Sequence, residues 1–318
     1  MIRYLYLGRV PYGEALRLQE EFVALRSAGR IGNVLLLLEH PPVLTLGRNA
    51  KRSNILASDE LLATRGVTLH EINRGGDVTY HGPGQLIGYP IFDLRSLRSP
   101  GGGNRLGPVD FVRLMEEALI RLCGDFGVRA GRICGLTGVW CGLPSGSAEG
   151  SPTGDPAQIS SKTQEPEGRK IAAIGIHVAR GVTSHGFAFN VTTDLRDFAL
   201  INPCGLTGHP VTSLENEIAK GIAREVSDPA SLPGLESIAQ RAACQFGLVF
   251  NQPILAIESL AALRAQAQAS AKSAPDPRAP VAPDSDFPAP EFPAEDTPLQ
   301  IPPEIERLRR TKDRPIPA

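Results

Sequence analysis

The chain has 318 residues, of which 42% are hydrophobic, and its formal net charge is −1. This length supports one large folded domain or two small ones, and the near-neutral charge gives no reason to expect binding to nucleic acid or to membrane surfaces. The longest uninterrupted aliphatic run, 34–38, is far too short to cross a bilayer. The amino terminus lacks the features of a secretion signal, so we expect a cytoplasmic protein.

The first part of the chain mixes helical and strand periods. Apolar residues between Ala15 and Leu25 recur at helical spacing, whereas the unbroken apolar run 33–39 predicts a buried strand. Asp110 is in a position to cap a second helix, which continues to Leu122.

The second part continues this mixture. Strands are predicted at 137–141, 170–178 and 187–192, and a helix at 235–246. In the third strand large apolar residues alternate with small or polar ones, so its two sides face different environments. Strands joined by short turns, with helices between them, predict an α+β fold with a mixed, largely antiparallel sheet flanked by helices.

Composition divides the chain into a catalytic domain and a tail. We predict that the domain spans 1–255 and contains a polar, turn-rich insertion at 143–168, which we expect to be a flexible loop at a hairpin tip. Residues 256–318 begin with an Ala-rich helix and continue into a Pro-rich segment, which we expect to be extended and disordered.

An odd number of cysteines and the absence of Cys-x-x-Cys spacing argue against disulfides or a zinc site, and we expect no metal. Four of the five lie in helical or strand patterns and are expected to pack in the core: Cys123, Cys134, Cys141 and Cys244. Cys204 instead lies in a turn between Pro203 and Gly205, where a side chain is exposed and can be held in place. It is therefore our candidate nucleophile, although a Pro-Cys-Gly tripeptide alone is weak evidence.

Two further segments are candidates for a site. In 73–89, glycines that let a ligand approach the backbone separate polar side chains that include Arg74 and His81; a solvated connecting turn is the alternative. The segment is not a phosphate loop, because it lacks the Gly-Lys-Ser/Thr ending. Lys170 opens an apolar strand of small residues, either as a solvated strand-end charge or at the rim of an apolar pocket. His81 and His185 are possible helpers or structural residues.

Together these segments resemble the lipoyl(octanoyl) transferase family, also called lipoate-protein ligase B. Their order and spacing match the family apart from the inserted loop, over roughly residues 1–250. The residues that carry the resemblance are Arg74–Gly76, Thr79–His81, Gln85, Tyr89, Lys170–Gly175, His185–Ala188, Asn190 and Pro203–Gly205.

The resemblance implies a biotin-protein-ligase/lipoate-ligase-like catalytic domain that is a monomer and needs no cofactor. It makes Cys204 the nucleophile that carries the acyl thioester, and Lys170 the residue that lowers the pKa of its thiol. It also implies an acyl-substrate pocket formed by Arg74, Gly75, Gly76, Asp77, Val78, Thr79, Tyr80, His81, Ala173, Ile174, Gly175, Gly186, Phe187 and Ala188.

The implied reaction begins endogenous lipoate synthesis. Octanoyl-acyl carrier protein donates its acyl group to the enzyme, and a lysine of a lipoyl domain accepts it, in 2-oxoacid dehydrogenase complexes or the glycine cleavage H protein. We expect Lys170 to take the proton of the incoming amine once the thiolate is consumed. The basic run 48–52 could steer acidic substrates or be an ordinary solvated loop.

Two other functions are compatible with parts of this pattern. An ATP-dependent lipoate or biotin ligase would share the fold but would need no cysteine. A carrier-protein binding module without catalysis would form no octanoyl adduct.

Overall fold

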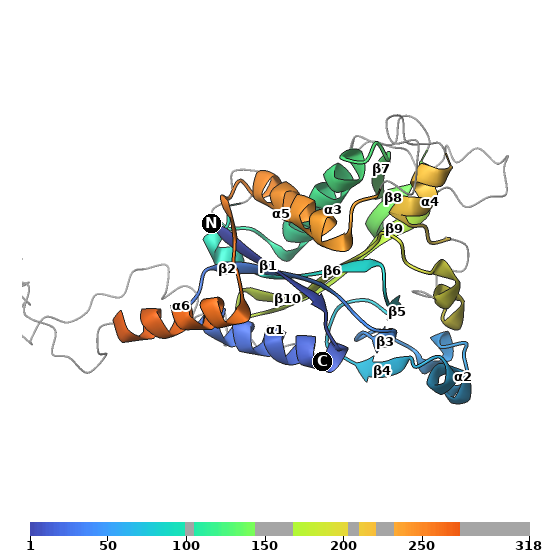
Figure 1. Cartoon of the computed structure of the whole chain (residues 1–318), viewed down its shortest axis with the longest axis horizontal. Helices are drawn as coiled ribbons and strands as arrows, with labels where there is room; N and C mark the ends of the chain where they lie inside the picture. The colour runs from blue at the N-terminus through green and yellow to red at the C-terminus, as the bar shows by residue number, and fades with distance from the viewer. Residues whose placement is uncertain (99–104, 144–167, 203–209, 221–231, 274–318) are drawn as a thin grey trace, which may run out of the picture. The chain divides into compact units, whose positions relative to one another are not determined.

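An eight-stranded sheet organises the part of the chain that the structure, a computed structural model, describes: 1–98, 105–143, 168–202, 210–220 and 232–273 (Figure 1). The strand order is β11-β1-β2-β6-β10-β9-β8-β7. β1 is parallel to both β2 and β11, and every other neighbouring pair is antiparallel. The strands are β1 (Ile2–Arg9), β2 (Asn33–Glu39), β6 (Gln85–Ile91), β7 (Ala130–Ile133), β8 (Leu136–Cys141), β9 (Arg169–Ala179), β10 (Val182–Asn190) and β11 (Ile254–Ala256).

A second, three-stranded sheet has the order β4-β3-β5. Its strands are β3 (Val43–Leu46), β4 (Thr68–Glu71) and β5 (Val78–His81). The helices are α1 (Tyr12–Ser27), α2 (Asp59–Thr64), α3 (Pro108–Gly124), α4 (Leu214–Ala219), α5 (Leu235–Val249) and α6 (Leu260–Ser273), with 3-10 turns η1 (Arg52–Asn54), η2 (Leu94–Ser96) and η3 (Leu195–Leu200). The predicted α+β class with a mixed, largely antiparallel sheet is confirmed.

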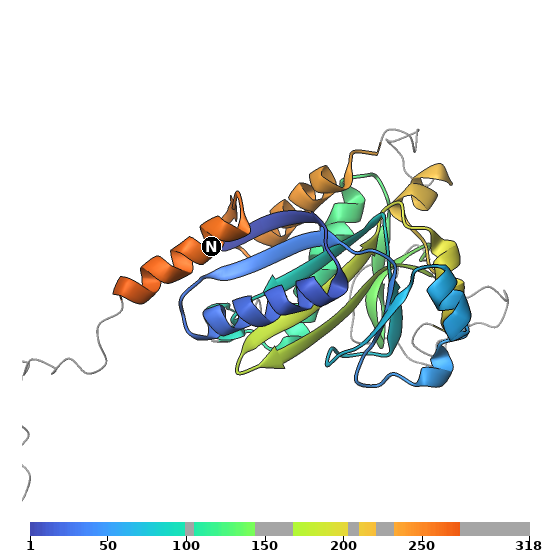
Figure 2. The same ribbon diagram turned by 60° about the horizontal axis from the view of Figure 1, so that its bottom comes forward.

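Helices cover both faces of the large sheet (Figures 1 and 2). α3 and α5 pack on one face, and α1 and α6 on the other. β2 lies between them, with Leu35 and Leu37 in the first core and Leu36 and Leu38 in the second. Burial on both faces explains why β2 reads as an unbroken apolar run.

The predicted alternation of large and small side chains along β10 is confirmed, because its two sides face different cores. Phe187 and Phe189 point into the core under α3 and α5, whereas Ala188 packs in the core under α1. The inserted loop also joins paired strands, as predicted, because Cys141 at the end of β8 is opposite Arg169 at the start of β9.

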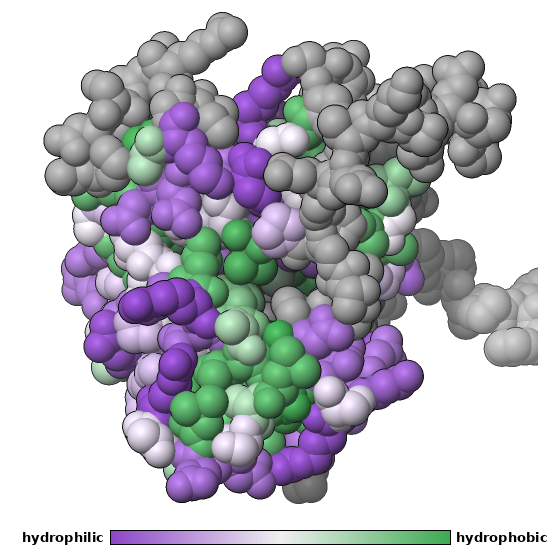
Figure 3. Space-filling view, turned by 90° about the vertical axis from the view of Figure 1, so that its right-hand side faces the viewer, coloured by the Kyte–Doolittle hydropathy of each residue, from purple (hydrophilic) through white to green (hydrophobic). Residues whose placement is uncertain are grey.

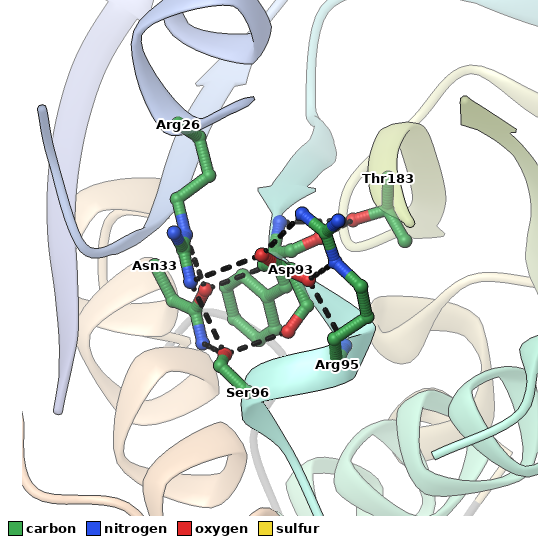
Figure 4. A network of polar contacts seen from close by, with 7 residues as sticks. Arg26, Asn33, Asp93, Arg95, Ser96 and Thr183 are labelled. Atoms are coloured by element: carbon green, nitrogen blue, oxygen red, sulfur yellow. Dashed lines mark hydrogen bonds and ion pairs between the residues drawn. The ribbon is translucent and has the colours of Figure 1, made fainter. Parts of the chain in front are cut away.

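A polar network ties together the ends of three central strands (Figure 4). Asn33 Oδ1 at the start of β2 accepts from Arg26 Nε at 2.9 Å and from Asp93 N, just after β6, at 3.0 Å. Arg95 binds the Asp93 carboxylate with two hydrogen bonds of 2.8 Å. Thr183 Oγ1 accepts from Phe92 N at 2.9 Å, which joins the start of β10 to the same network.

Two expectations need correction. Asp110 lies in the first turn of α3 and does not cap it; Gly107 precedes the helix, because Pro108 is well suited to the first helical position. Cys134 and Cys244 are exposed and do not pack in the core. The predicted Ala-rich helix after 255 is α6, whose Leu263 and Ala267 are buried in the core that α1 also forms; the boundary at 255 stays a prediction.

The inserted segment 144–167 and the Pro-rich tail lie outside the described residues, so their predicted disorder stays a prediction. Within the described ranges, no helix combines the length and apolar character needed to cross a membrane.

Candidate active site

A cavity of about 400 Å³ lies where β6, β9 and β10 meet the loop between β4 and β5. Helices α1 and α3 each contribute a side chain to it, Tyr12 and Val112. Thirteen of the sixteen candidate residues line it: Arg74, Gly75, Gly76, Val78, Thr79, His81, Lys170, Ala173, Ile174, Gly175, Gly186, Phe187 and Ala188. The structure therefore brings together residues separated by more than a hundred positions.

Three candidates are placed differently. Cys204 lies outside the described residues. The Asp77 carboxylate instead accepts from Val78 N at 2.7 Å and from Asn54 Nδ2 at 2.5 Å, and so fixes its own turn. Tyr80 is buried on the other side of β5, where its hydroxyl donates to Asp197 Oδ2 at 2.6 Å. Asp77 and Tyr80 therefore support the site without lining it.

The cavity also has walls that sequence reasoning missed. Tyr12, Ile87, Val112, Gly135, Leu136, Thr137 and Ile176 line it, as do Tyr89 and His185, which were considered only as part of the motifs. Tyr12 and Val112 read as ordinary helix residues, and nothing in the local sequence distinguishes them from core. Ile176 belongs to the same strand as Lys170 and could have been included from that position.

The Arg74–Gly76 turn crosses directly over β9. Gly75 N donates to Ile176 O at 3.1 Å. A Cβ built on Gly175 would lie 2.8 Å from Gly75 O, closer than such atoms approach. The absence of a side chain at Gly175 is therefore what allows the turn to form one wall of the cavity.

Arg74 is held by the small sheet and is largely buried. Its Nη2 donates to Thr45 O at 2.8 Å and to Thr45 Oγ1 at 3.0 Å, and its Nη1 donates to Gly75 O at 2.9 Å. These hydrogen bonds place the positive charge of Arg74 in the wall of the cavity and fix the Arg74–Gly76 turn to β3 of the small sheet.

A chain of hydrogen bonds leads from Thr45 across the sheet. His81 Nδ1 donates to Gln85 Oε1 at 2.8 Å, Gln85 Nε2 donates to Asn190 Oδ1 at 2.8 Å, and Asn190 Nδ2 donates to Thr212 O at 2.9 Å. His81 Nε2, 3.4 Å from Thr45 Oγ1, is then the acceptor nitrogen. Burial lowers the pKa of His81 to about 3, so this neutral form is the one present at pH 7.

Two further histidines are buried and neutral. His40 Nδ1 donates to Val10 O at 2.7 Å, and its Nε2 accepts from the Tyr89 hydroxyl at 2.7 Å. His185 Nε2 donates a hydrogen bond to Asn73 Oδ1 at 2.8 Å. Burial lowers the pKa of each of these two histidines to about 4. Of Arg74, His81 and His185, which line the cavity, only Arg74 therefore carries a charge at pH 7.

Lys170 stands at the start of β9 and lines the cavity. Its backbone N donates to Pro210 O and its carbonyl accepts from Thr212 N, each at 2.9 Å. The segment that begins at Pro210, six positions after Cys204, is therefore hydrogen-bonded to the backbone of Lys170. The hydrogen-bond chain through Asn190 ends on the same segment.

An apolar surface lies at the end of the molecule that carries α2. Figure 3 shows apolar residues gathered there in one patch. Leu56 and Leu61 are 64% and 40% exposed, and Leu56 N donates to Leu200 O at 2.9 Å. The patch therefore adjoins the stretch of chain that leads to Cys204. Contiguous exposed apolar patches often mark sites where proteins bind one another.

Comparison with known proteins gives a consistent result. The model of the lipoyl protein ligase A/B catalytic domain matches residues 11–230. An octanoyltransferase of Acidobacterium capsulatum is 55% identical over 259 residues, which is 81% of this chain and 94% of that protein. An octanoyltransferase of Koribacter versatilis is 48% identical and covers 82% of this chain and 88% of its own length.

Solved structures share the fold at low identity. Lipoate-protein ligase A bound with ATP has a TM-score of 0.53 at 14% identity, covering 86% of this chain and 95% of its own. A bi-partite lipoate protein ligase from Thermoplasma acidophilum has a TM-score of 0.52 at 16% identity, covering 85% and 92%. These two likenesses concern the fold alone.

Proposed function

Because this chain belongs to the lipoyl protein ligase A/B catalytic-domain family, we propose that it transfers an octanoyl group from octanoyl-acyl carrier protein to a lysine of lipoyl domains. In this proposal Cys204 carries the group as a thioester and Lys170 activates the thiol. The reaction supplies the octanoylated protein from which lipoate is made. The high identity to octanoyltransferases over most of the chain supports this acyl group.

The observation that carries the proposal is the position of Lys170. It lines an apolar cavity, and its backbone is bonded to the segment that follows Cys204. Six residues of chain span at most roughly 20 Å, so the covalent chain allows the sulfur to reach the ammonium. An ammonium close to a thiol favours the thiolate, which is the form that attacks a thioester.

The proposed reaction has two steps. The Cys204 thiolate attacks the carbonyl carbon of octanoyl-acyl carrier protein, the carbon–sulfur bond to pantetheine breaks, and the pantetheine thiol leaves. The amine of the acceptor lysine then attacks the enzyme thioester, an amide forms, and the Cys204 thiolate is released. We propose that Lys170 gives its proton to the departing pantetheine sulfur in the first step and, then neutral, takes the proton that the amine loses in the second. No ATP is consumed, because the donor is already a thioester.

The cavity suits an apolar chain. Ala173, Ile174, Gly175 and Ala188 offer small or aliphatic walls. Burying the seven carbons beyond the octanoyl carbonyl would contribute about 5 kcal/mol at 0.8 kcal/mol for each methylene. The same cavity would hold the octanoyl chain both while the donor is attacked and while the enzyme thioester is discharged.

The two protein substrates are proposed to approach the face that carries α2. Arg48 and Lys51 are exposed on it, beside the apolar Leu56, and a basic rim would attract acidic carrier and lipoyl domains. Raising the salt concentration and replacing Lys51→Glu should both slow transfer. A rate unaffected by either change would remove the steering role. The assignment to the cytoplasm and to a monomer stays a prediction.

Intact-mass measurement tests the proposed function. After incubation with octanoyl-acyl carrier protein, the chain should gain one octanoyl group, and Cys204→Ser should gain none. Addition of a lipoyl domain should discharge the adduct without ATP or magnesium. A requirement for ATP would favour a ligase, and a chain that binds the carrier but gains no mass would favour a binding module.

The proposed second role of Lys170 can be tested separately. Arginine keeps the positive charge but does not act as a base near neutral pH. In Lys170→Arg, acylation should be retained in part, whereas discharge to the lipoyl domain should be strongly slowed. Discharge at the full rate would rule out proton transfer to Lys170.

A further inference from the structure

The side chain of Lys170 lies in a slot formed by the neighbouring strand β8. A Cβ built on Gly138 would lie 3.4 Å from Lys170 Cε and 3.7 Å from Cδ. The hydrocarbon part of Lys170 therefore runs over the bare backbone of Gly138. Gly138 has a φ of +129°, which favours glycine, and a Cβ there would lie only 2.6 Å from Ala172 O of the neighbouring strand.

The ammonium of Lys170 lies over an aromatic ring. Its Nζ is 4.6 Å from the centre of the Trp140 ring. Trp140 is fully buried, so the ring cannot follow a moving lysine. An indole face attracts a cation within about 6 Å of its centre, and the attraction is stronger where water is excluded.

The backbone of β8 is distorted where it meets Lys170. The pairing of β8 with β9 shifts register between Val139 and Trp140, so that Trp140 is opposite Lys170. Glu116 of α3, which is fully buried, accepts from Gly138 N at 3.0 Å through Oε1. Its Oε2 accepts from Arg113 at 2.7 Å and from Arg132 at 3.1 Å. The carboxylate that fixes Gly138 is therefore itself held from two sides.

We propose that Trp140 is a positioning residue, which holds the Lys170 ammonium over the indole face at the mouth of the acyl cavity while the thiol is activated. This inference rests on the proposed function for the part played by Lys170 in acyl transfer. It goes beyond that function in naming what places the ammonium. A lysine has four rotatable bonds, and without the slot its charge would be spread over many positions.

The placement can be tested without any measurement of activity. The chain has six lysines and one tryptophan. Labelling with ¹³C-lysine therefore gives few signals, and only one indole ring could shift them. The ε-CH₂ protons of Lys170, assigned with Lys170→Arg, should resonate upfield of those of the other lysines. The shift should vanish in Trp140→Leu and persist in part in Trp140→Phe. An unshifted signal in the unmodified chain would overturn the placement.

The consequence for acyl transfer is tested by a double-mutant cycle. Trp140→Leu should slow the formation of the octanoyl adduct by roughly 2- to 30-fold, the factor that corresponds to 0.5–2 kcal/mol of cation–π attraction. Trp140→Phe should recover part of the rate. In a Lys170→Met background the same Trp140→Leu change should have less than about a twofold effect.

Phe111→Leu is the matched control, because Phe111 is another aromatic side chain that is fully buried. It should lower stability without shifting the Lys170 signal. Equal slowing by Trp140→Leu with and without Lys170 would mean that Trp140 only packs the core, and would overturn the inference. If the unmodified chain forms no adduct, the proposed function fails, while the lysine spectrum still decides the placement.

Discussion

Arg169 and Glu217 form a two-pronged ion pair, with Arg169 Nε 2.9 Å from Glu217 Oε1 and Nη2 2.8 Å from Oε2. The pair joins the first residue of β9 to α4, and the Glu217 side chain is only 1% exposed. Thr212 also donates to Glu217 Oε1 at 2.5 Å. The residue before Lys170 and the segment after Cys204 are thus fixed to one carboxylate.

Glu217→Gln should lower the free energy of unfolding at pH 7 by about 1–3 kcal/mol, because Arg169 loses a charged partner. Burial alone would raise the pKa of Glu217, but the hydrogen bonds from Arg169 and Thr212 outweigh it and hold the pKa below its usual value. The stabilisation is therefore present above the ordinary glutamate pKa and is lost as pH falls through the lowered one. Urea unfolding of both chains at neutral and acid pH measures it.

The control for this change is Glu215→Gln, which removes one charge from the same short helix at a half-buried position. It should change stability much less. If both variants lost the same stability, net charge and not the ion pair would explain the result.

Gln85→Met should break the buried hydrogen-bond chain while keeping the volume of the side chain. It leaves the His81 Nδ1–H and Asn190 Oδ1 without their partner, and each unmet buried group costs about 1–3 kcal/mol. Because Asn190 also holds Thr212, transfer should slow beyond the loss of stability. Unfolding in urea and the rate of adduct formation below the unfolding transition separate the two effects.

Unchanged transfer by a destabilised but folded Gln85→Met chain would show that the network supports only the fold. Asn190→Ala should then also leave the rate of transfer unaffected.

Stability should fall as the pH drops from neutrality toward 4, because three histidines are buried neutral. Burial lowers the pKa of His40 and His185 to about 4 and that of His81 to about 3. Below the unfolded pKa of about 6.5 the unfolded chain binds protons that the folded chain does not. Each histidine can then contribute up to about 1.4 kcal/mol of lost stability for each pH unit.

Urea unfolding at several pH values between 5 and 7 should show this slope, and His40→Gln should make it shallower. His177→Gln, a change at a half-buried position on β9, should leave the slope nearly as it is. A slope equal in the unmodified chain and in His40→Gln would contradict the role of His40.

Gly175→Ala should weaken binding of the acyl donor. The added methyl would lie 2.8 Å from Gly75 O, so the Arg74–Gly76 turn must shift and the cavity must change shape. We expect KM for octanoyl-acyl carrier protein to rise roughly 5- to 30-fold, the factor that corresponds to about 1–2 kcal/mol of binding. Gly124→Ala, whose methyl would meet nothing within 4 Å, is the control, and an equal KM in both variants would argue against the wall.

Local sequence was sufficient for the elements whose environment is uniform. β2 was predicted at its observed bounds, 33–39, because burial on both faces requires an unbroken apolar run. The motifs around Arg74, Lys170 and Gly186 were assigned to a site through their resemblance to a family. Their glycines and small residues can be recognised in the sequence without knowing which distant residues they contact.

The start of α3 shows the limit of local rules. Asp110 satisfies the composition of a helix cap, but Pro108, two residues earlier, already begins the helix. Two local signals competed, and the fixed backbone angle of proline prevailed.

The sequence by itself determined the α+β class, the order of the elements and most of the residues that line the cavity, because periodicity and motif spacing are properties of the chain alone. Only the tertiary structure decided that Tyr12 and Val112 close the cavity, that Tyr80 points away from it, and that Trp140 lies under Lys170. Those relationships depend on strand register and on which face of each strand is turned inward. A shift of one residue reverses them without changing a single local pattern.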